Sequence, residues 1–263
     1  MKKFIAKLLK PLSSNRHTQS LFSFIQRVAL FGLFGDEWDF LRNGELGIIK
    51  KVAAKPTSQA IVFDVGANEG IYCQCLLDEF SKTQTKLSVH GFEPASDTFK
   101  RYTAKFVGNS SVVCNNIGLS DSIQKLRLFK SSASSGFATL YAENKFNFDT
   151  SEEVSFTTLD EYCQTHSLNT IDFLKMDVEG HELSVLKGAT NLLQSKKIKA
   201  IQFEFGAGNI SSKTYFKDFY DLLNSDYQLY RILKNGMYPI AKYDYSLEVF
   251  GRVSNYVAFL KIG

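Results

Sequence analysis

From Ile61 onward, short apolar runs alternate regularly with longer amphipathic stretches, and this pattern constrains the fold more than any other feature of the sequence. Five of the apolar runs are predicted to be strands: Ile61–Val65, Leu87–Phe92, Val112–Asn116, Phe173–Met176 and Ala200–Phe205. The stretches between them predict helices at Ile71–Phe80, Ser96–Phe106, Leu159–His166 and His181–Gln194. Such alternation is typical of βαβ units, so we expect an α/β fold with a doubly wound, mostly parallel sheet.

Two segments depart from this rhythm. After Phe205 we expect a helix near Tyr215–Leu223 and then two β-like runs, Tyr227–Leu233 and Tyr256–Ile262, which would pair antiparallel at one edge of the sheet. Between Lys125 and Thr158 lies an insertion, and insertions of this length often cover a site.

The insertion contains strand-like runs at Leu126–Phe129 and Val154–Thr157 on either side of the small, polar segment Ser131–Gly136. Small residues at Ser134–Gly136 would let the segment move as a lid. Its aromatic residues could form part of a wall for an acceptor molecule, although most are expected in the core: Phe137, Tyr141, Phe146 and Phe148.

A helical region precedes the first strand. A helix is predicted beyond Pro11 through Phe34, and a shorter one from Glu45 to Ala54 that Pro56 ends. We therefore divide the chain into an N-terminal helical extension, residues 1–56, and one α/β domain, residues 57–263.

The extension also contains the apolar segments that bear on membrane contact. Met1–Lys10 places Phe4 and Leu8 at helical spacing among lysines, which suits weak contact with a membrane surface. The apolar stretch Leu21–Phe34 is interrupted by polar residues, so we expect a helix that packs on the domain.

Composition excludes several classes of protein. A hydrophobic fraction of 44% with 22% charged residues is that of an ordinary globular protein. The 31 basic and 27 acidic residues give no argument for a nucleic-acid partner. The four cysteines lack the CxxC spacing of a zinc site, so we expect reduced thiols and a cytoplasmic protein: Cys73, Cys75, Cys114 and Cys163.

The turn after the first predicted strand reads Asp-Val-Gly-Ala-Asn-Glu-Gly, residues 64–70, and is a candidate cofactor loop. A side chain at Gly66 would collide with a cofactor lying across the strand end, and Gly70 permits a tight entry into the next helix. Asp64 could hold the turn or bind an ammonium group. Glycines at this place also serve tight packing alone, and that interpretation stays open.

A carboxylate at the end of the second predicted strand strengthens the cofactor hypothesis. Glu93, in Gly-Phe-Glu-Pro, follows the glycine turn by roughly 20 residues, which is where the ribose diol of an adenosine cofactor is bound in such sheets. The turn lacks the GxGxxG spacing that binds a pyrophosphate, and Glu69 would repel one. These features favour S-adenosyl-L-methionine, a cation at its sulfonium, over a nicotinamide cofactor.

Taken together and in this order, five segments resemble the FkbM-type methyltransferases. They are DVGANEG, GFEP, the run Asn116–Asp121, Thr158–Asp160 and KMDVEGHE at 175–182, supported by Leu186–Ala189. The resemblance covers about Ile61 to Phe205. It implies a seven-stranded Rossmann-like fold, S-adenosylmethionine as donor, and O-methylation of a sugar, glycan or natural-product hydroxyl.

The resemblance also implies roles for residues. The donor loop would comprise Asp64, Gly66, Ala67, Asn68 and Gly70, with Glu93 on the ribose, Pro94 beside it, Asn116 near the adenine, and Asp177 facing the same crevice.

Asp177, Glu179 and His181 are the candidate catalytic residues. They follow the fourth predicted strand, whose carboxyl end should face the same crevice as Gly66. Methyl transfer to oxygen requires removal of a hydroxyl proton, and either His181 or Asp177 could accept it. His181 could instead be part of a helix N-terminus, and the acidic cluster with Glu204 could ligate a divalent metal, although we predict no resident metal.

Two other functions stay open. One is a domain that binds the donor without turnover and serves as a scaffold; the other is a nicotinamide-dependent oxidoreductase. The identity of the acceptor, the oligomeric state and membrane association are not determined by the sequence.

Overall fold

The computed structural model describes residues 7, 9–35, 39–131, 138–141 and 148–261, and it divides into two compact units, Met1–Trp38 and Asp39–Gly263. Most of the predicted helix Met1–Lys10 lies outside the described residues, as do Phe137, Phe146 and Ser134–Gly136.

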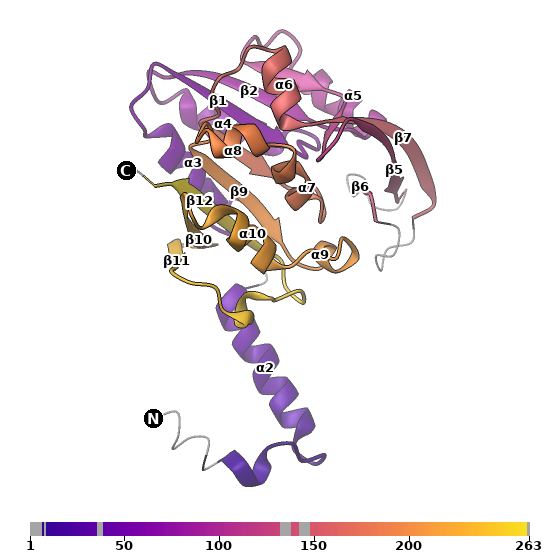
Figure 1. Ribbon diagram of the computed structural model, residues 1–263, viewed down its shortest axis with the longest axis vertical. Coiled ribbons are helices and arrows are strands. Elements are labelled where there is room, and N and C mark those ends of the chain that lie inside the picture. The colour runs from indigo at the N-terminus through magenta and orange to yellow at the C-terminus, as the bar shows by residue number, and fades with distance from the viewer. Residues whose placement is uncertain (1–6, 8, 36–38, 132–137, 142–147, 262–263) are drawn as a thin grey trace. The chain divides into compact units, whose positions relative to one another are not determined.

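In the described part of the first unit lie a short 3-10 helix, η1 (Lys10–Leu12), and the α-helix α2 (Gln19–Phe34) (Figure 1). The sequence predicted a helix directly after Pro11, but α2 begins only at Gln19. In between, the hydroxyl of Thr18 donates to the carbonyls of Leu12 and Asn15, and such side-chain bonds compete with helical ones. None of the helices in the described part of the chain is long and apolar enough to span a bilayer.

The second unit is built on an eight-stranded sheet with the order β11-β10-β12-β9-β8-β1-β2-β3. Its strands are β1 (Gln59–Val65), β2 (Lys86–Phe92), β3 (Val112–Asn115), β8 (Phe173–Met176), β9 (Ala200–Phe205), β10 (Tyr227–Leu233), β11 (Gly236–Ile240) and β12 (Ser254–Leu260). The five strands from β3 to β9 are parallel, and the last three pair antiparallel. The predicted doubly wound, mostly parallel sheet is confirmed.

Strand order reverses between β1 and β8. From β1 the chain proceeds outward to β2 and β3, whereas β8 returns to the other side of β1 and continues to β9. A ligand crevice forms at such a switch point, outside the carboxyl ends of the strands.

Helices cover both faces of the sheet (Figure 1). They are α3 (Glu45–Ala53), α4 (Ile71–Phe80), α5 (Ser96–Lys105), α6 (Leu159–Thr165), α7 (Glu182–Lys187), α8 (Thr190–Gln194), α9 (Gly208–Ser211) and α10 (Phe216–Leu223), with a 3-10 turn, η2 (Tyr245–Leu247). Successive residues of one strand enter opposite cores: Val62 packs with α3, α4 and α5, and Phe63 with α6, α7, α8 and α10. Strands buried on both faces explain the continuous apolar runs of the sequence.

The sheet has one strand more than the seven that the resemblance implied. The additional strand, β11, folds back on β10 through the two-residue turn Lys234–Asn235 and occupies the edge. Its Pro239 lacks an N–H and so weakens the sequence signal for a strand, but an edge position tolerates it.

The helix predicted at His181–Gln194 is two helices, α7 and α8. The break is at Gly188, where a Cβ atom would overlap the carbonyl oxygen of Ser120. The apolar spacing continues across this break, which is why the sequence indicated one helix.

Helix α3, which the sequence assigned to the extension 1–56, belongs to the second unit. Its Ile48, Ile49 and Val52 are buried in the core with α4.

The insertion, together with the short strand before it, forms a second, four-stranded sheet with the order β4-β7-β5-β6. Its strands are β4 (Gly118–Leu119), β5 (Gln124–Lys130), β6 (Ala138–Thr139) and β7 (Thr150–Thr157). Leu128, Val154 and Phe156 form a small core beneath it.

Gly66 fixes the distance between the β1 turn and the end of β8. Its φ is +78°, and a Cβ atom would overlap the carbonyl oxygen of Asp177. The sequence analysis assigned this glycine to avoiding a cofactor; in the structure, the atom that excludes a side chain is the protein's own backbone.

We expect Gly66→Ala to destabilise the protein by about 3 kcal/mol or more, because the left-handed backbone and the overlap with Asp177 both disfavour a side chain. Gly108→Ala is the matched control, since Gly108 has the same φ of +78° and no atom within 4 Å of its Cβ position. The control should lose only about 1 to 2 kcal/mol in urea unfolding. Equal losses in the two variants would contradict the overlap.

Candidate functional site

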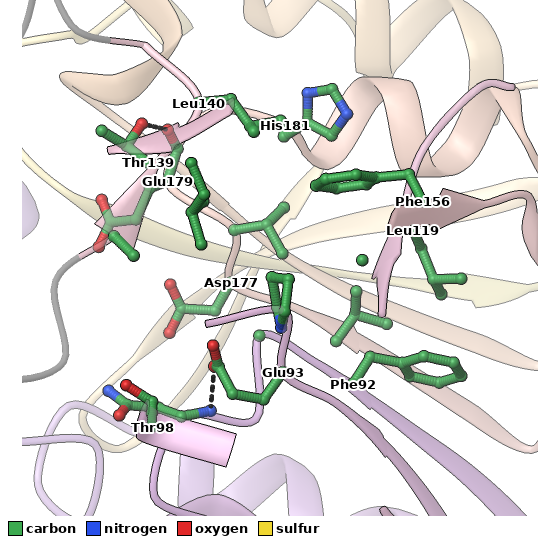
Figure 2. A pocket seen from close by; sticks show the side chains of 18 residues that line it. Phe92, Glu93, Thr98, Leu119, Thr139, Leu140, Phe156, Asp177, Glu179 and His181 are labelled. Atoms are coloured by element: carbon green, nitrogen blue, oxygen red, sulfur yellow. Dashed lines mark hydrogen bonds between the residues drawn. The ribbon is translucent and has the colours of Figure 1, made fainter. Parts of the chain in front are cut away.

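A pocket opens at the switch point, above the carboxyl ends of β1, β2 and β8 (Figure 2). Gly66 and Asn68 come from the turn after β1, Glu93 follows β2, and Asp177 follows β8. In Figure 2, Asp177 and Glu93 lie on one side of the pocket, and the apolar side chains of Phe92, Leu119 and Phe156 lie on the other. The pocket therefore has an acidic side and an apolar side.

Beneath the pocket, Lys175 of β8 forms a buried ion pair with Asp64 of β1. The two residues are direct partners in the sheet, and Nζ of Lys175 lies 3.2 Å from Oδ1 of Asp64 and 3.6 Å from Oδ2 of Asp177. Nζ also donates to the carbonyl of Gly66 at 3.3 Å. One ammonium group thus ties together the ends of both strands at the switch point.

The pKa values follow from this burial. Burial raises the pKa of Asp64, and Lys175 offsets part of that effect. Burial acts to lower the pKa of Lys175, but the carboxylates of Asp64, Asp177 and Glu45 together outweigh it and raise that pKa. Lys175 is therefore a fixed cation and not a proton donor at neutral pH.

Glu93 is 7% exposed and holds the two loops that border the pocket. Its Oε2 accepts the N–H of Asn68 at 3.0 Å, and its Oε1 accepts the N–H of Ala95 at 2.8 Å. Burial raises the pKa of Glu93 to about 7, although both N–H bonds favour the carboxylate. Each oxygen retains a second lone pair that could accept a hydroxyl.

The turn after β8 carries the three candidate catalytic residues. Oε1 of Glu182 accepts the N–H groups of Val178 and Gly180 at 2.9 and 3.3 Å, which holds Glu179 in a left-handed conformation with φ of +56°. Burial, together with the neighbouring carboxylates of Asp177 and Glu182, raises the pKa of Glu179 to about 8. This side chain lines the pocket.

His181 is buried, and both of its ring nitrogens have partners. Nε2 lies 2.9 Å from the hydroxyl of Ser120, and Nδ1 lies 3.0 Å from the hydroxyl of Tyr141. The ring packs edge-on against Phe156. Burial lowers the pKa of His181 to about 4, so it is neutral at physiological pH.

Comparison with known proteins agrees with this geometry. The sequence model of the family described as "Methyltransferase FkbM domain" matches residues 64–232. This chain belongs to the FkbM methyltransferase family. The FkbM match begins in β1 and ends in β10, so it leaves out α2, α3, β11 and β12.

Two relatives illustrate the similarity. The hexuronic acid methyltransferase AglP of Haloferax volcanii is 31% identical over 166 residues, which are 62% of this chain and 64% of that protein. The crystal structure of the methyltransferase FkbM from Methylobacillus flagellatus superposes with a TM-score of 0.50 at 15% identity, covering 78% of this chain and 44% of that one. The similarity to the Methylobacillus flagellatus protein is a similarity of fold.

The pocket brings together seven of the residues predicted from the FkbM motifs: Gly66, Asn68, Glu93, Pro94, Asp177, Glu179 and His181. Four others do not line it: Asp64, Ala67, Gly70 and Asn116.

These four residues have structural contacts. Asp64 is paired with Lys175. The ammonium group that Asp64 was predicted to bind is therefore that of a lysine of the protein itself. The Ala67 N–H donates to the carbonyl of Phe92 at 2.9 Å. Gly70 has φ of +73° and begins α4 against the ring of Tyr102.

Asn116 holds the loop after β2. Its side-chain amide donates to the carbonyls of Glu93 and Pro94, at 2.9 and 3.1 Å.

Sequence reasoning missed the apolar side of the pocket and the lysine beneath it. Leu119, Leu128, Thr139, Leu140 and Phe156 line the pocket, and all of them come from the insertion or the strand just before it. The alternation of apolar and polar residues in β5 and β7 could have indicated that Leu128 and Phe156 point inward. The lysine within the otherwise apolar run Phe173–Met176 was a sequence signal for a buried charge, because a buried lysine needs a partner.

Two other expectations for this FkbM site require correction. The repulsion attributed to Glu69 is weakened, because Nε of Arg101 lies 2.8 Å from its carboxylate. Of the aromatic residues proposed as an acceptor wall, the two within the described residues do not line the pocket: Tyr141 binds His181, and Phe148 packs on Phe129.

The metal hypothesis for Asp177, Glu179, His181 and Glu204 finds no support in the geometry. Both ring nitrogens of His181 are hydrogen bonded, and the described residues contain no group of three or more acidic, histidine or cysteine side chains arranged to hold a metal ion. Burial, with Asp177 and Glu179 nearby, raises the pKa of Glu204 well above its usual range.

We expect Lys175→Met to destabilise the protein by about 3 to 5 kcal/mol, because it leaves the buried Asp64 carboxylate without a partner. The double variant with Asp64→Asn should recover most of this loss. Urea unfolding of the two variants makes the comparison, and a double variant as unstable as the single one would contradict the pairing.

The loss of unfolding free energy in Lys175→Met should also depend on pH. Without the lysine, the folded-state pKa of Asp64 rises further above its unfolded value. A group of this kind stabilises the folded state at low pH, and that contribution is lost as pH rises through the folded-state pKa. The deficit should therefore be smaller in acid than at neutral pH.

Proposed function

We propose that this protein transfers the methyl group of S-adenosylmethionine to a hydroxyl group of a sugar or a related acceptor. The observation that supports this most directly is the two-sided pocket at the switch point, which is built from the FkbM motif residues Gly66, Glu93 and Asp177.

The charge of the pocket suits a cationic donor. Glu93, Asp177 and Glu179 line it, and among the described lining residues there is neither lysine nor arginine. A cationic sulfonium donor is attracted to such a site, and the pyrophosphate of a nicotinamide cofactor is repelled. This argues against the oxidoreductase alternative independently of Glu69.

The residues present fit this donor. The remaining lone pairs of the Glu93 carboxylate would accept the two ribose hydroxyls, and Gly66 and Asn68 would border the amino-acid part. The apolar side, with Phe92 and Leu119, would receive the adenine. When bound, S-adenosylmethionine supplies an electrophilic methyl carbon, whose bond to sulfur breaks as the new bond to oxygen forms.

A sugar hydroxyl is the acceptor that the relatives favour, since the Haloferax volcanii protein is named for a hexuronic acid. The protein must align this oxygen with the methyl carbon and accept its proton. Thr139 and Leu140 border the pocket beside Glu179 and would contact the acceptor (Figure 2).

Of the three candidate catalytic residues, Glu179 is the one that we assign as the base that accepts the proton of the acceptor hydroxyl. Its pKa of about 8 makes its carboxylate a stronger base than His181, whose pKa is about 4 and whose ring nitrogens are both hydrogen bonded. Asp177 lies near Lys175 and adds negative charge where the cationic donor would bind. His181 would position the insertion through Tyr141.

We expect adenosylhomocysteine to bind the purified protein in calorimetry, and Glu93→Ala to weaken that binding by about a hundredfold, because two charge-assisted hydrogen bonds are lost. Glu69→Ala is the control: Glu69 is a neighbouring carboxylate that does not line the pocket, and binding should change by less than about threefold. Binding of NAD alone would overturn the proposal.

We expect Glu179→Gln to lower kcat/KM by about a hundredfold or more while adenosylhomocysteine affinity is retained. In the unaltered protein, a base must be deprotonated to act, so kcat/KM should rise with pH and level off above about 8. Glu179→Gln should lose this rise, and the exposed-site control Glu161→Gln should keep it.

Methyl transfer is measured with sugar acceptors and a labelled donor. Loss of activity in His181→Ala together with full activity in Glu179→Gln would reverse the assignment. Tight donor binding with no turnover on any acceptor would favour the scaffold alternative.

A further inference from the structure

Within the first unit, helix α2 leaves much of its apolar surface uncovered. Six of its large apolar side chains are between 48% and 61% exposed: Leu21, Phe24, Ile25, Val28, Phe31 and Leu33. No residue of the helix is buried. A contiguous exposed apolar surface of this kind marks a site of interaction.

The six exposed apolar side chains lie outside a narrower polar stripe of the helix. Gln19, Ser23 and Gln26 recur at spacings of four and three residues, with Ser20 and Arg27 beside them, and form a polar stripe that Leu30 and Phe34 interrupt. The six apolar side chains occupy the remaining arc. This arrangement is amphipathic, with a wide apolar side that carries two phenylalanines.

The charge around the helix is of one sign. The first 35 residues of the sequence contain six Lys or Arg residues and no Asp or Glu. Among the described residues, Lys7, Lys10 and Arg16 precede α2, and Arg27 lies on its polar stripe. Because the whole chain has 31 basic and 27 acidic residues, this segment accounts for its net positive charge.

We propose that α2 binds an anionic lipid surface, with its axis in the plane of the interface. Phe24, Val28 and Phe31 would enter the boundary between headgroups and acyl chains, and the basic residues would lie among the anionic headgroups. Charge decides between a lipid surface and a second copy of this chain, since two copies would bring segments of the same positive charge together.

This inference does not depend on the proposed methyl transfer, because the apolar arc belongs to residues outside the FkbM match and its test measures binding alone.

The test is cosedimentation of the full chain with vesicles. We expect binding to vesicles that mix phosphatidylglycerol with phosphatidylcholine. Binding to vesicles of pure phosphatidylcholine should be weaker by about tenfold or more, because only phosphatidylglycerol supplies negative charge. Added salt should weaken binding to the anionic vesicles.

Matched variants separate the two sides of the helix. Phe24→Ser with Phe31→Ser should reduce binding to anionic vesicles by about tenfold or more, because it removes two rings from the apolar arc. Gln19→Ser with Gln26→Ser, on the polar stripe, should change binding by less than about twofold. Lys10→Glu with Arg16→Glu should remove the preference for anionic vesicles.

Two results would overturn the proposal. One is absence of binding to anionic vesicles. The other is self-association of the unaltered chain, seen by analytical ultracentrifugation, that Phe24→Ser with Phe31→Ser abolishes while vesicle binding is unchanged. Urea unfolding of each variant confirms that the second unit remains folded.

Discussion

The ion pair between Lys175 and Asp64 is the contact on which the rest of the site depends. It joins β1 to β8 where strand order reverses, directly beside the Gly66 turn and the Asp177 turn. A buried charge of this kind is costly unless it is paired. The same ammonium acts to lower the pKa values of Asp64, Glu93 and Glu179, which burial raises. The Lys175 side chain therefore affects both the charges and the backbone arrangement at the switch point.

Much of the fold was predictable because strands buried on both faces leave continuous apolar runs. Phe173–Met176, Ala200–Phe205 and Tyr227–Leu233 have the bounds that the sequence indicated. The prediction failed where tertiary contact overrides local pattern. The helix predicted at His181–Gln194 is divided at Gly188, where the Ser120 carbonyl leaves no room for a side chain, and no local signal carries that contact.

The candidate site was predictable to the extent that its residues follow strand ends. Glu93 and Asp177 were found in this way, and both line the pocket. Sequence could not reveal that Asp64 faces a lysine instead of a ligand, because their pairing depends on the register of β1 and β8. Nor could it reveal that His181 is enclosed by Ser120 and Tyr141, since these residues come from separate segments. Roles assigned by spacing alone tend to overlook such partners.

The two outer strands of the large sheet have a consequence for solubility. Unpaired N–H and C=O groups at a sheet edge are a template for a strand of another molecule. Here one edge is β3, which is only four residues long, and the other is β11, which is five residues long and carries Pro239. Short edges and a proline give an incoming strand few bonds to form. Pairing of this wide, apolar sheet with the edge of a second molecule is therefore disfavoured at both outer strands.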